Sequence, residues 1–149
     1  MELKFDFSDF NKKFDRIVEQ TFPALIEKGL GVAMNDLLGD CIQEVPTVPL
    51  KEGWLRGSGS IFVQNKFEGT SAGIGGGKTK FANTDHGEMI SLGKYVGVVG
   101  FNAPYAAKMH EGIDYQFTDP SSGAKYLESK IVRKKELYIK DIADTIKAG

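Results

Sequence analysis

The sequence predicts an α+β fold built as a single domain over residues 1–149. Apolar residues recur at helical spacing near both ends of the chain, whereas two runs in the middle are rich in β-branched and aromatic residues. Hydrophobic residues make up 41% of the chain and charged residues 26%, as in proteins with a buried core. We therefore expect one small antiparallel or mixed sheet packed against a long N-terminal helix and a C-terminal helix.

The first part of the chain predicts two helices. Apolar residues between positions 10 and 22 share one helical face, and Ser8 or Asp9 is suited to cap this helix. Pro23 either breaks the ladder there or begins the next helix. A long apolar stripe then predicts a helix over residues 23–44, which the prolines that follow bring to an end.

The middle of the chain predicts two strands separated by a long loop. The strands cover residues 60–65 and 91–101. Residues 66–90 are rich in Gly, Thr, Lys and Asn and show little periodicity, so we expect a mobile loop, with a hairpin excursion as the alternative.

The last part of the chain predicts a short helical turn and a final helix. The turn covers residues 105–110. A stripe of apolar residues predicts the final helix over 122–147, capped by Asp119 or Ser122.

Charge and composition exclude some classes of function. The net charge is −1, and no third of the chain is basic enough to predict tight binding to a phosphate backbone. The single cysteine, Cys41, lies on the apolar face of a predicted helix, where core packing is expected. The chain shows no signal-peptide pattern and no apolar run long enough to span a membrane, so we expect no membrane partner.

Glycine is the unusual feature, since 12 of the 18 glycines lie between positions 53 and 100. Residues 72–79 read AGIGGGKT, which fits the relaxed phosphate-loop pattern. A working phosphate loop follows a buried strand and opens a helix. The flanks here predict neither, which favours a flexible loop with two lysines and leaves a nucleotide-binding protein as the alternative.

Other catalytic patterns are incomplete. His110-Glu111 begins a zinc-protease motif, but Asp114 stands where the second histidine belongs. Asp85 and His86 have no nucleophile elbow to complete a triad. We therefore expect a protein that is not an enzyme, with no catalytic residue, no cofactor and no metal ligand.

Three blocks of the sequence resemble the tail-completion, or head–tail joining, family of long-tailed bacteriophages, whose members are also called minor capsid or neck proteins. The first block is Val45-Pro46 with KEGWLRGS at 51–58. The second is VVGF at 98–101 with YAAKMHEG at 105–112. The third is GAKYLE at 123–128. The chain departs from the family in having Lys51-Glu52 in place of the usual Asp-Thr and a longer glycine-rich stretch between strands.

The resemblance implies a structural virion protein, similar to tail terminators, that is made in the cytoplasm of the bacterial host and forms a ring, typically hexameric, in the virion. The ring joins the head connector or stopper protein to the tail tube or terminator protein at the neck. Genomic DNA passes through its lumen without sequence-specific binding. A tail-tube or capsid-decoration protein is a further alternative. The expected interface residues are Trp54, Leu55, Arg56, Lys66, Lys78, Lys80, Tyr105, His110 and Glu111.

Overall fold

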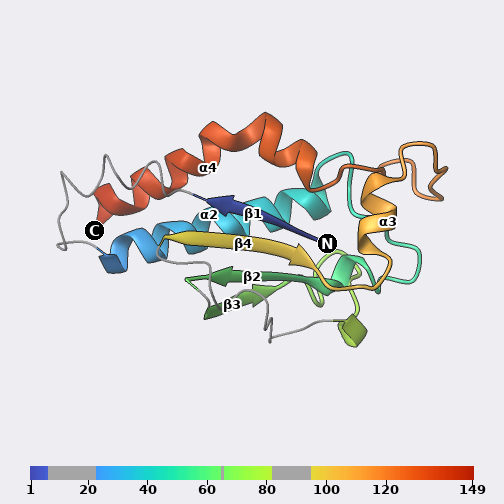
Figure 1. Cartoon of the computed structure of the whole chain (residues 1–149), viewed down its shortest axis with the longest axis horizontal. Coiled ribbons are helices and arrows are strands. Elements are labelled where there is room, and N and C mark those ends of the chain that lie inside the picture. The colour runs from blue at the N-terminus through green and yellow to red at the C-terminus, as the bar shows by residue number, and fades with distance from the viewer. Residues whose placement is uncertain (7–22, 65, 82–94) are drawn as a thin grey trace.

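The computed structural model of the chain describes residues 1–6, 23–64, 66–81 and 95–149. It confirms the α+β class, with a sheet on one side of two long helices (Figure 1). The predicted helix over residues 10–22 lies outside the described residues, as do positions 82–94 of the predicted loop and second strand.

The sheet has four described strands, and all its pairs are antiparallel. They are β1 (Glu2–Asp6), β2 (Gly59–Val63), β3 (Lys66–Thr70) and β4 (Val96–Phe101), in the order β1-β4-β2-β3. β1 was not expected from the sequence. Nor was a regular strand at 66–70, so the expectation of a structureless loop is wrong there, and the hairpin alternative is correct for β2 and β3.

The two central strands are buried along their whole length. Ile61 pairs with Val99, and both belong to the main core beneath the helices. Phe62, Val96 and Val98 form a second small buried cluster. Burial on both faces explains why these strands read as nearly continuous apolar runs.

Two helices of 21 residues each form the second layer: α2 (Pro23–Gln43) and α4 (Glu128–Ala148). They run antiparallel, because Gly29 meets Ile142 whereas Asp40 meets Lys134. A Cβ atom at Gly29 would lie 3.0 Å from the Ile142 Cα, so glycine permits this close approach. The bounds of α2 confirm the helix predicted over residues 23–44.

The final helix begins later than expected, at Glu128 rather than residue 122. Lys125 has a φ of 58°, which helical backbone does not permit. Ser122 instead forms an isolated parallel bridge with Thr47. The segment before α4 is therefore pinned to the chain that follows α2.

The shorter elements gather at the right-hand end of the domain in Figure 1. They are α3 (Ala106–Glu111), which confirms the predicted turn, and the 3₁₀ turns η1 (Arg56–Ser58) and η2 (Thr79–Phe81). Among the described residues, no helix has both the length and the apolar character to cross a membrane.

Candidate functional site

A group of aromatic and lysine side chains lies where η1, η2 and the start of α3 meet. The Trp54 indole N–H donates to Glu52 Oε2 over 2.7 Å. The Nζ atoms of Lys78 and Lys80 lie 4.8 Å and 5.3 Å from the centroid of the Trp54 ring, which is cation–π distance. We call the set Trp54, Lys78, Lys80, Phe81 and Tyr105 the aromatic–lysine surface.

The aromatic residues of this surface stand over a cavity of about 400 Å³. Phe81 and Tyr105 meet edge to face with their centroids 6.3 Å apart. Tyr105 keeps 37% of its surface exposed. Leu50 and Met109 line the cavity beneath them. The surface therefore combines an apolar floor with an exposed polar rim, as binding surfaces commonly do.

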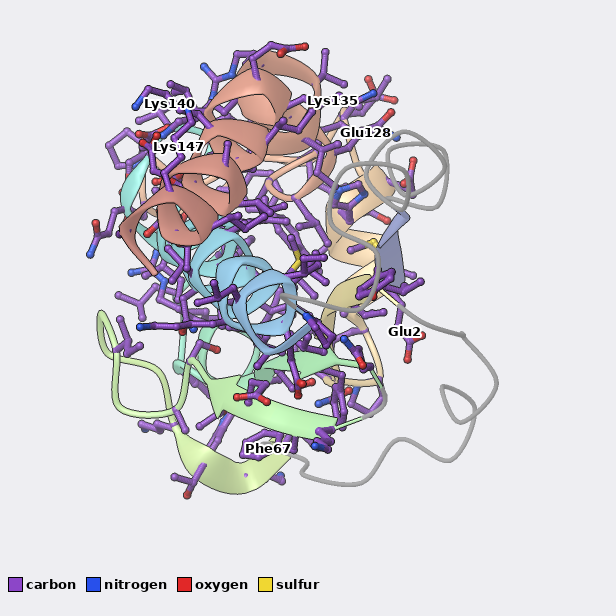
Figure 2. The ribbon with its side chains drawn as sticks, turned by 90° about the vertical axis from the view of Figure 1, so that its left-hand side faces the viewer. Glu2, Phe67, Glu128, Lys135, Lys140 and Lys147 are labelled. Carbon is purple, nitrogen blue, oxygen red and sulfur yellow. The ribbon has the colours of Figure 1, made fainter. Side chains whose placement is uncertain are left out.

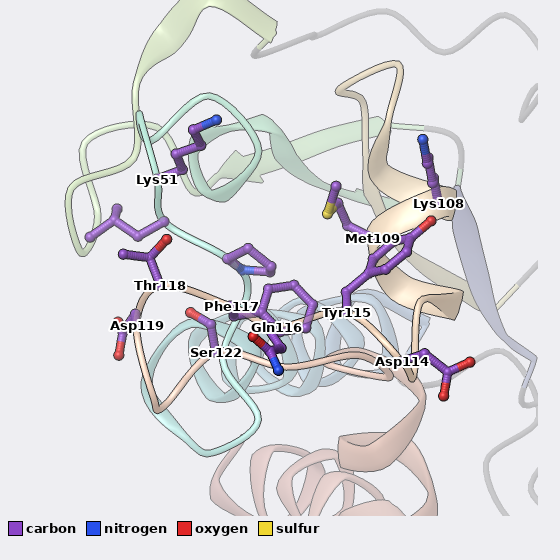
Figure 3. Close-up of a pocket in the computed structure, with 12 residues that line it drawn as sticks. Lys51, Lys108, Met109, Asp114, Tyr115, Gln116, Phe117, Thr118, Asp119 and Ser122 are labelled. Carbon is purple, nitrogen blue, oxygen red and sulfur yellow. The ribbon is translucent and has the colours of Figure 1, made fainter.

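A second cavity of about 540 Å³ adjoins the first and shares Leu50 and Met109 with it. Figure 3 shows Met109 and Tyr115 side by side toward one end of this cavity and Thr118 toward the other. The two cavities form a shallow groove across the end of the domain, between the chain after α2 and the chain after α3.

The aromatic–lysine surface carries positive charge. Lys51 and Lys80 line its cavity and Lys78 lies over the indole, whereas Glu52 is the one acidic residue in the described lining. Burial raises the pKa of the Tyr105 phenol above its usual value, and Glu52 raises it further. The phenol is therefore neutral and does not offset the lysines.

Leu55 and Arg56, which were expected at an interface, lie beneath the surface instead. Leu55 belongs to the main core. The Arg56 guanidinium donates to the Val48 carbonyl through Nε at 3.0 Å and Nη2 at 2.7 Å, and to the Gly75 carbonyl at 3.0 Å. Burial lowers the pKa of Arg56, and Asp119 opposes that shift. Arg56 thus holds together the segments that support the surface.

His110 and Glu111 lie on the far side of α3 and have an internal role. The buried imidazole Nδ1 lies 2.8 Å from Glu111 Oε1, and Nε2 accepts the backbone N–H of Glu128 at 3.2 Å. This pattern fits the neutral Nδ1–H tautomer, with the ring capping α4. The ring also meets Tyr126 edge to face at 4.9 Å.

The three groups His110, Glu111 and Glu128 have ligand atoms within 4.8 Å of one another. Both imidazole nitrogens already have partners. Lys125 donates to Glu111 and lies 3.0 Å from Glu128, and these bonds lower the pKa of Glu111 and raise that of Lys125. A cation would have to displace this ammonium, so the donor set fits an ion-pair network better than a metal.

The glycine loop at residues 72–79 is folded against η1 rather than open to a phosphate. The N–H groups of Gly73, Ile74, Gly77 and Lys78 all donate to carbonyls of the chain itself. The element that follows is the three-residue η2, which provides no helix N-terminus for an anion. Among the described residues, this loop therefore lacks the geometry of a phosphate cradle.

The structure thus brings together four of the nine expected interface residues, namely Trp54, Lys78, Lys80 and Tyr105. Lys66 lies apart on β3, where its Nζ is 3.6 Å from Glu27. Phe81 and Met109 were missed, because their neighbours in sequence gave no pattern that points to them. The closeness of Trp54 to residues 78–80 depends on the β2–β3 hairpin, which returns the chain to η1.

No family model, curated protein or solved structure matches this chain.

Proposed function

We propose that this chain is a structural virion protein that forms a ring, with six copies as the expected number, at the neck of a long-tailed phage. The ring joins the head connector to the tail tube and lets DNA pass through its lumen. Its role is assembly rather than catalysis.

The observation that carries the proposal is the meeting of the three blocks behind the resemblance. The Lys125 N–H in the third block donates to the His110 carbonyl in the second block at 2.7 Å. The Tyr126 hydroxyl in the third block donates to the Ala106 carbonyl in the second at 2.9 Å. The third block also approaches the first, because a Cβ at Gly123 would lie 2.9 Å from the Pro46 Cβ. The three blocks are therefore neighbours in one packed unit, which supports treating them as one pattern rather than three unrelated segments.

The aromatic–lysine surface supports a role in protein contact. Aromatic residues are enriched at protein interfaces, where they bury a large area at little cost in side-chain entropy. Trp54 and Tyr105 are next in sequence to Leu55 and Ala106, which belong to the main core, so the surface is built on packed backbone before any partner arrives.

The nucleotide-binding alternative gains no support from the geometry of residues 72–79, because the N–H groups of Gly73, Ile74, Gly77 and Lys78 already donate to carbonyls of the chain. A tail-tube or capsid-decoration protein remains a distinct alternative, because it would use the same kind of surface in a lattice instead of a closed ring.

Antibody labelling of virions from the phage that encodes the chain tests the proposal. We expect label confined to one position between head and tail in electron micrographs. A control antibody against the major tail-tube protein should label the full tail length. Label along the tail or over the shell, or no label on intact and disrupted virions, would contradict the neck assignment.

A further inference from the structure

We propose that the aromatic–lysine surface of one copy binds an acidic groove, formed by α2 and β3, on the next copy. This inference rests on the proposed ring, and it names the two faces that form the contact. The acidic groove is defined by Glu27, Val32, Asn35, Asp36 and Glu68, which line a hollow of about 560 Å³.

The acidic groove carries the opposite charge to the aromatic–lysine surface. Glu27, Asp36 and Glu68 line it, with Lys28 as the one basic residue in the described lining. Glu27 has a distant contact with Lys66 at 3.6 Å. Asp36 and Glu68 are exposed, and Asp36 also forms a hydrogen bond with Asp141 of α4. At neutral pH the groove is therefore net negative.

The apolar parts of the two faces also correspond. Val32, which lines the acidic groove, is 38% exposed, and Phe67 on the neighbouring strand is 37% exposed. On the other face Tyr105 is exposed and Trp54 is half-buried. Each face thus places apolar side chains within a charged rim, and the rims have opposite signs. This arrangement both attracts the partner and sets its orientation.

The two faces lie too far apart for one copy to satisfy both. The acidic groove runs along the first part of α2, from Ala24 to Asp36, whereas the aromatic–lysine surface lies beyond the C-terminal end of that helix. At about 1.5 Å per residue, the 21 residues of α2 span about 30 Å. The left-hand end of the domain in Figure 1, which faces the viewer in Figure 2, presents the start of α2 with β3 below it.

A contact between two different faces of the same chain is heterologous. The growing assembly always has one free face at each end, so copies continue to add until the rotation between them closes a ring, or form an open filament if it does not close. The inferred contact therefore has the symmetry that a neck ring needs, whereas a contact of one face with itself would stop at a dimer.

Charge reversal on each face provides the test. Lys78→Glu with Lys80→Glu reverses the first face, and Asp36→Lys with Glu68→Lys reverses the second. A matched control is Lys135→Glu with Lys147→Glu, which changes the same charge on the outer side of α4 (Figure 2). Circular dichroism checks that each variant is folded, and sedimentation velocity with native mass spectrometry measures self-association of the full chain.

We expect wild type and the α4 control to associate in a salt-sensitive way with equal affinity. Each reversed variant alone should associate at least about tenfold more weakly, because like charges then face each other. An equimolar mixture of the two reversed variants should recover association, since every contact between unlike copies again joins opposite charges. Recovery in the mixture also shows that both variants are folded.

Unchanged association of either reversed variant, or failure of the mixture to recover, would overturn the contact. So would a wild type that stays monomeric at every concentration, or one whose lysine-dependent binding is to duplex DNA alone. These results leave the antibody labelling of the neck unaffected. A ring at the neck that survives charge reversal would refute this interface and not the proposed function.

Discussion

The pairing of two carboxyl groups between α2 and α4 gives a prediction that can be worked out in numbers. The pKa of Asp141 is raised from its ordinary value of 3.8 to about 6, first by burial, then by a hydrogen bond with Asp36 and by the charges of Asp36 and Asp144. The proton is shared across the contact between the helices. Replacing Asp141 with Asn supplies a neutral side chain of the same shape that can still donate to Asp36.

The direction in which stability changes with pH follows from how tightly the folded and unfolded states bind the proton. A folded-state pKa above the unfolded value means that the native protein holds the proton more tightly, so the stabilisation is complete below about pH 4 and is lost as the pH rises through 6. A difference of about two in pKa corresponds to about 3 kcal/mol. Asp141 is only partly buried, and solvent screening reduces this to about 1 kcal/mol.

Urea unfolding at pH 4.5 and pH 7.5 measures the effect, with fluorescence of the single tryptophan as the signal. We expect Asp141→Asn to match wild type at pH 4.5 and to be about 1 kcal/mol more stable at pH 7.5. Asp144→Asn is the control, because Lys140 binds that carboxylate at 2.6 Å and lowers its pKa. The control should show no gain at the higher pH.

The reasoning would be refuted by an Asp141→Asn variant whose difference from wild type is the same at both pH values. It would also be refuted by a variant that is less stable than wild type at pH 7.5. The comparison of variant with wild type removes the pH dependence of the other carboxylates, which the two proteins share.

Four further predictions use the same unfolding measurement or calorimetry. Gly57→Ala should lose at least about 2 kcal/mol, because its Cβ would lie 2.1 Å from the Lys78 carbonyl oxygen. Gly31→Ala, with no neighbour within 4 Å in α2, should gain about 0.5–1 kcal/mol, and equal effects would contradict the packing. His110→Ala should lose about 3 kcal/mol by leaving a cavity and the Glu128 N–H unpaired, and a loss below about 1 kcal/mol would argue against the cap. Titration with Mg-ATP should give no saturable heat, whereas micromolar binding that Lys78→Ala abolishes would revive the nucleotide alternative.

The long stripe of apolar residues at helical spacing was sufficient to predict α2, and the order of helical and strand patterns was sufficient to predict the fold class. The apolar stripe of α2, from Leu30 to Ile42, is buried, as its helical spacing predicts. β1 escaped prediction because Leu3, Lys4 and Phe5 form too short a pattern, and the strand is defined by its pairing with β4. Tertiary contacts of this kind are not visible in local sequence.

The start of α4 and the glycine loop show where local rules fail. Asp119 accepts the N–H of Ser121 and so caps a turn instead of the helix, while His110, distant in sequence, caps α4. The loop glycines were interpreted as giving mobility. In the structure a Cβ at Gly77 would lie 2.7 Å from the Gly57 Cα, so this glycine permits close packing between two segments.

The candidate site could be predicted only in part for the same reason. Trp54 was identified from its glycine-flanked turn, and the lysines were identified from the loop. Their meeting depends on the β2–β3 hairpin and on the hydrogen bond from the Lys78 N–H to the Gly53 carbonyl, which is 2.8 Å long. Arg56, by contrast, showed no sign in the sequence that its charge would be buried.

The most direct test of the central claim is a cryo-electron microscopy reconstruction of the neck in virions that carry this chain. We expect a closed ring of identical copies between the head connector and the tail tube, with density into which the α2–α4 pair and the four-stranded sheet fit. A neck whose density excludes this fold, or copies of the fold found along the tail tube or the capsid lattice, would contradict the account.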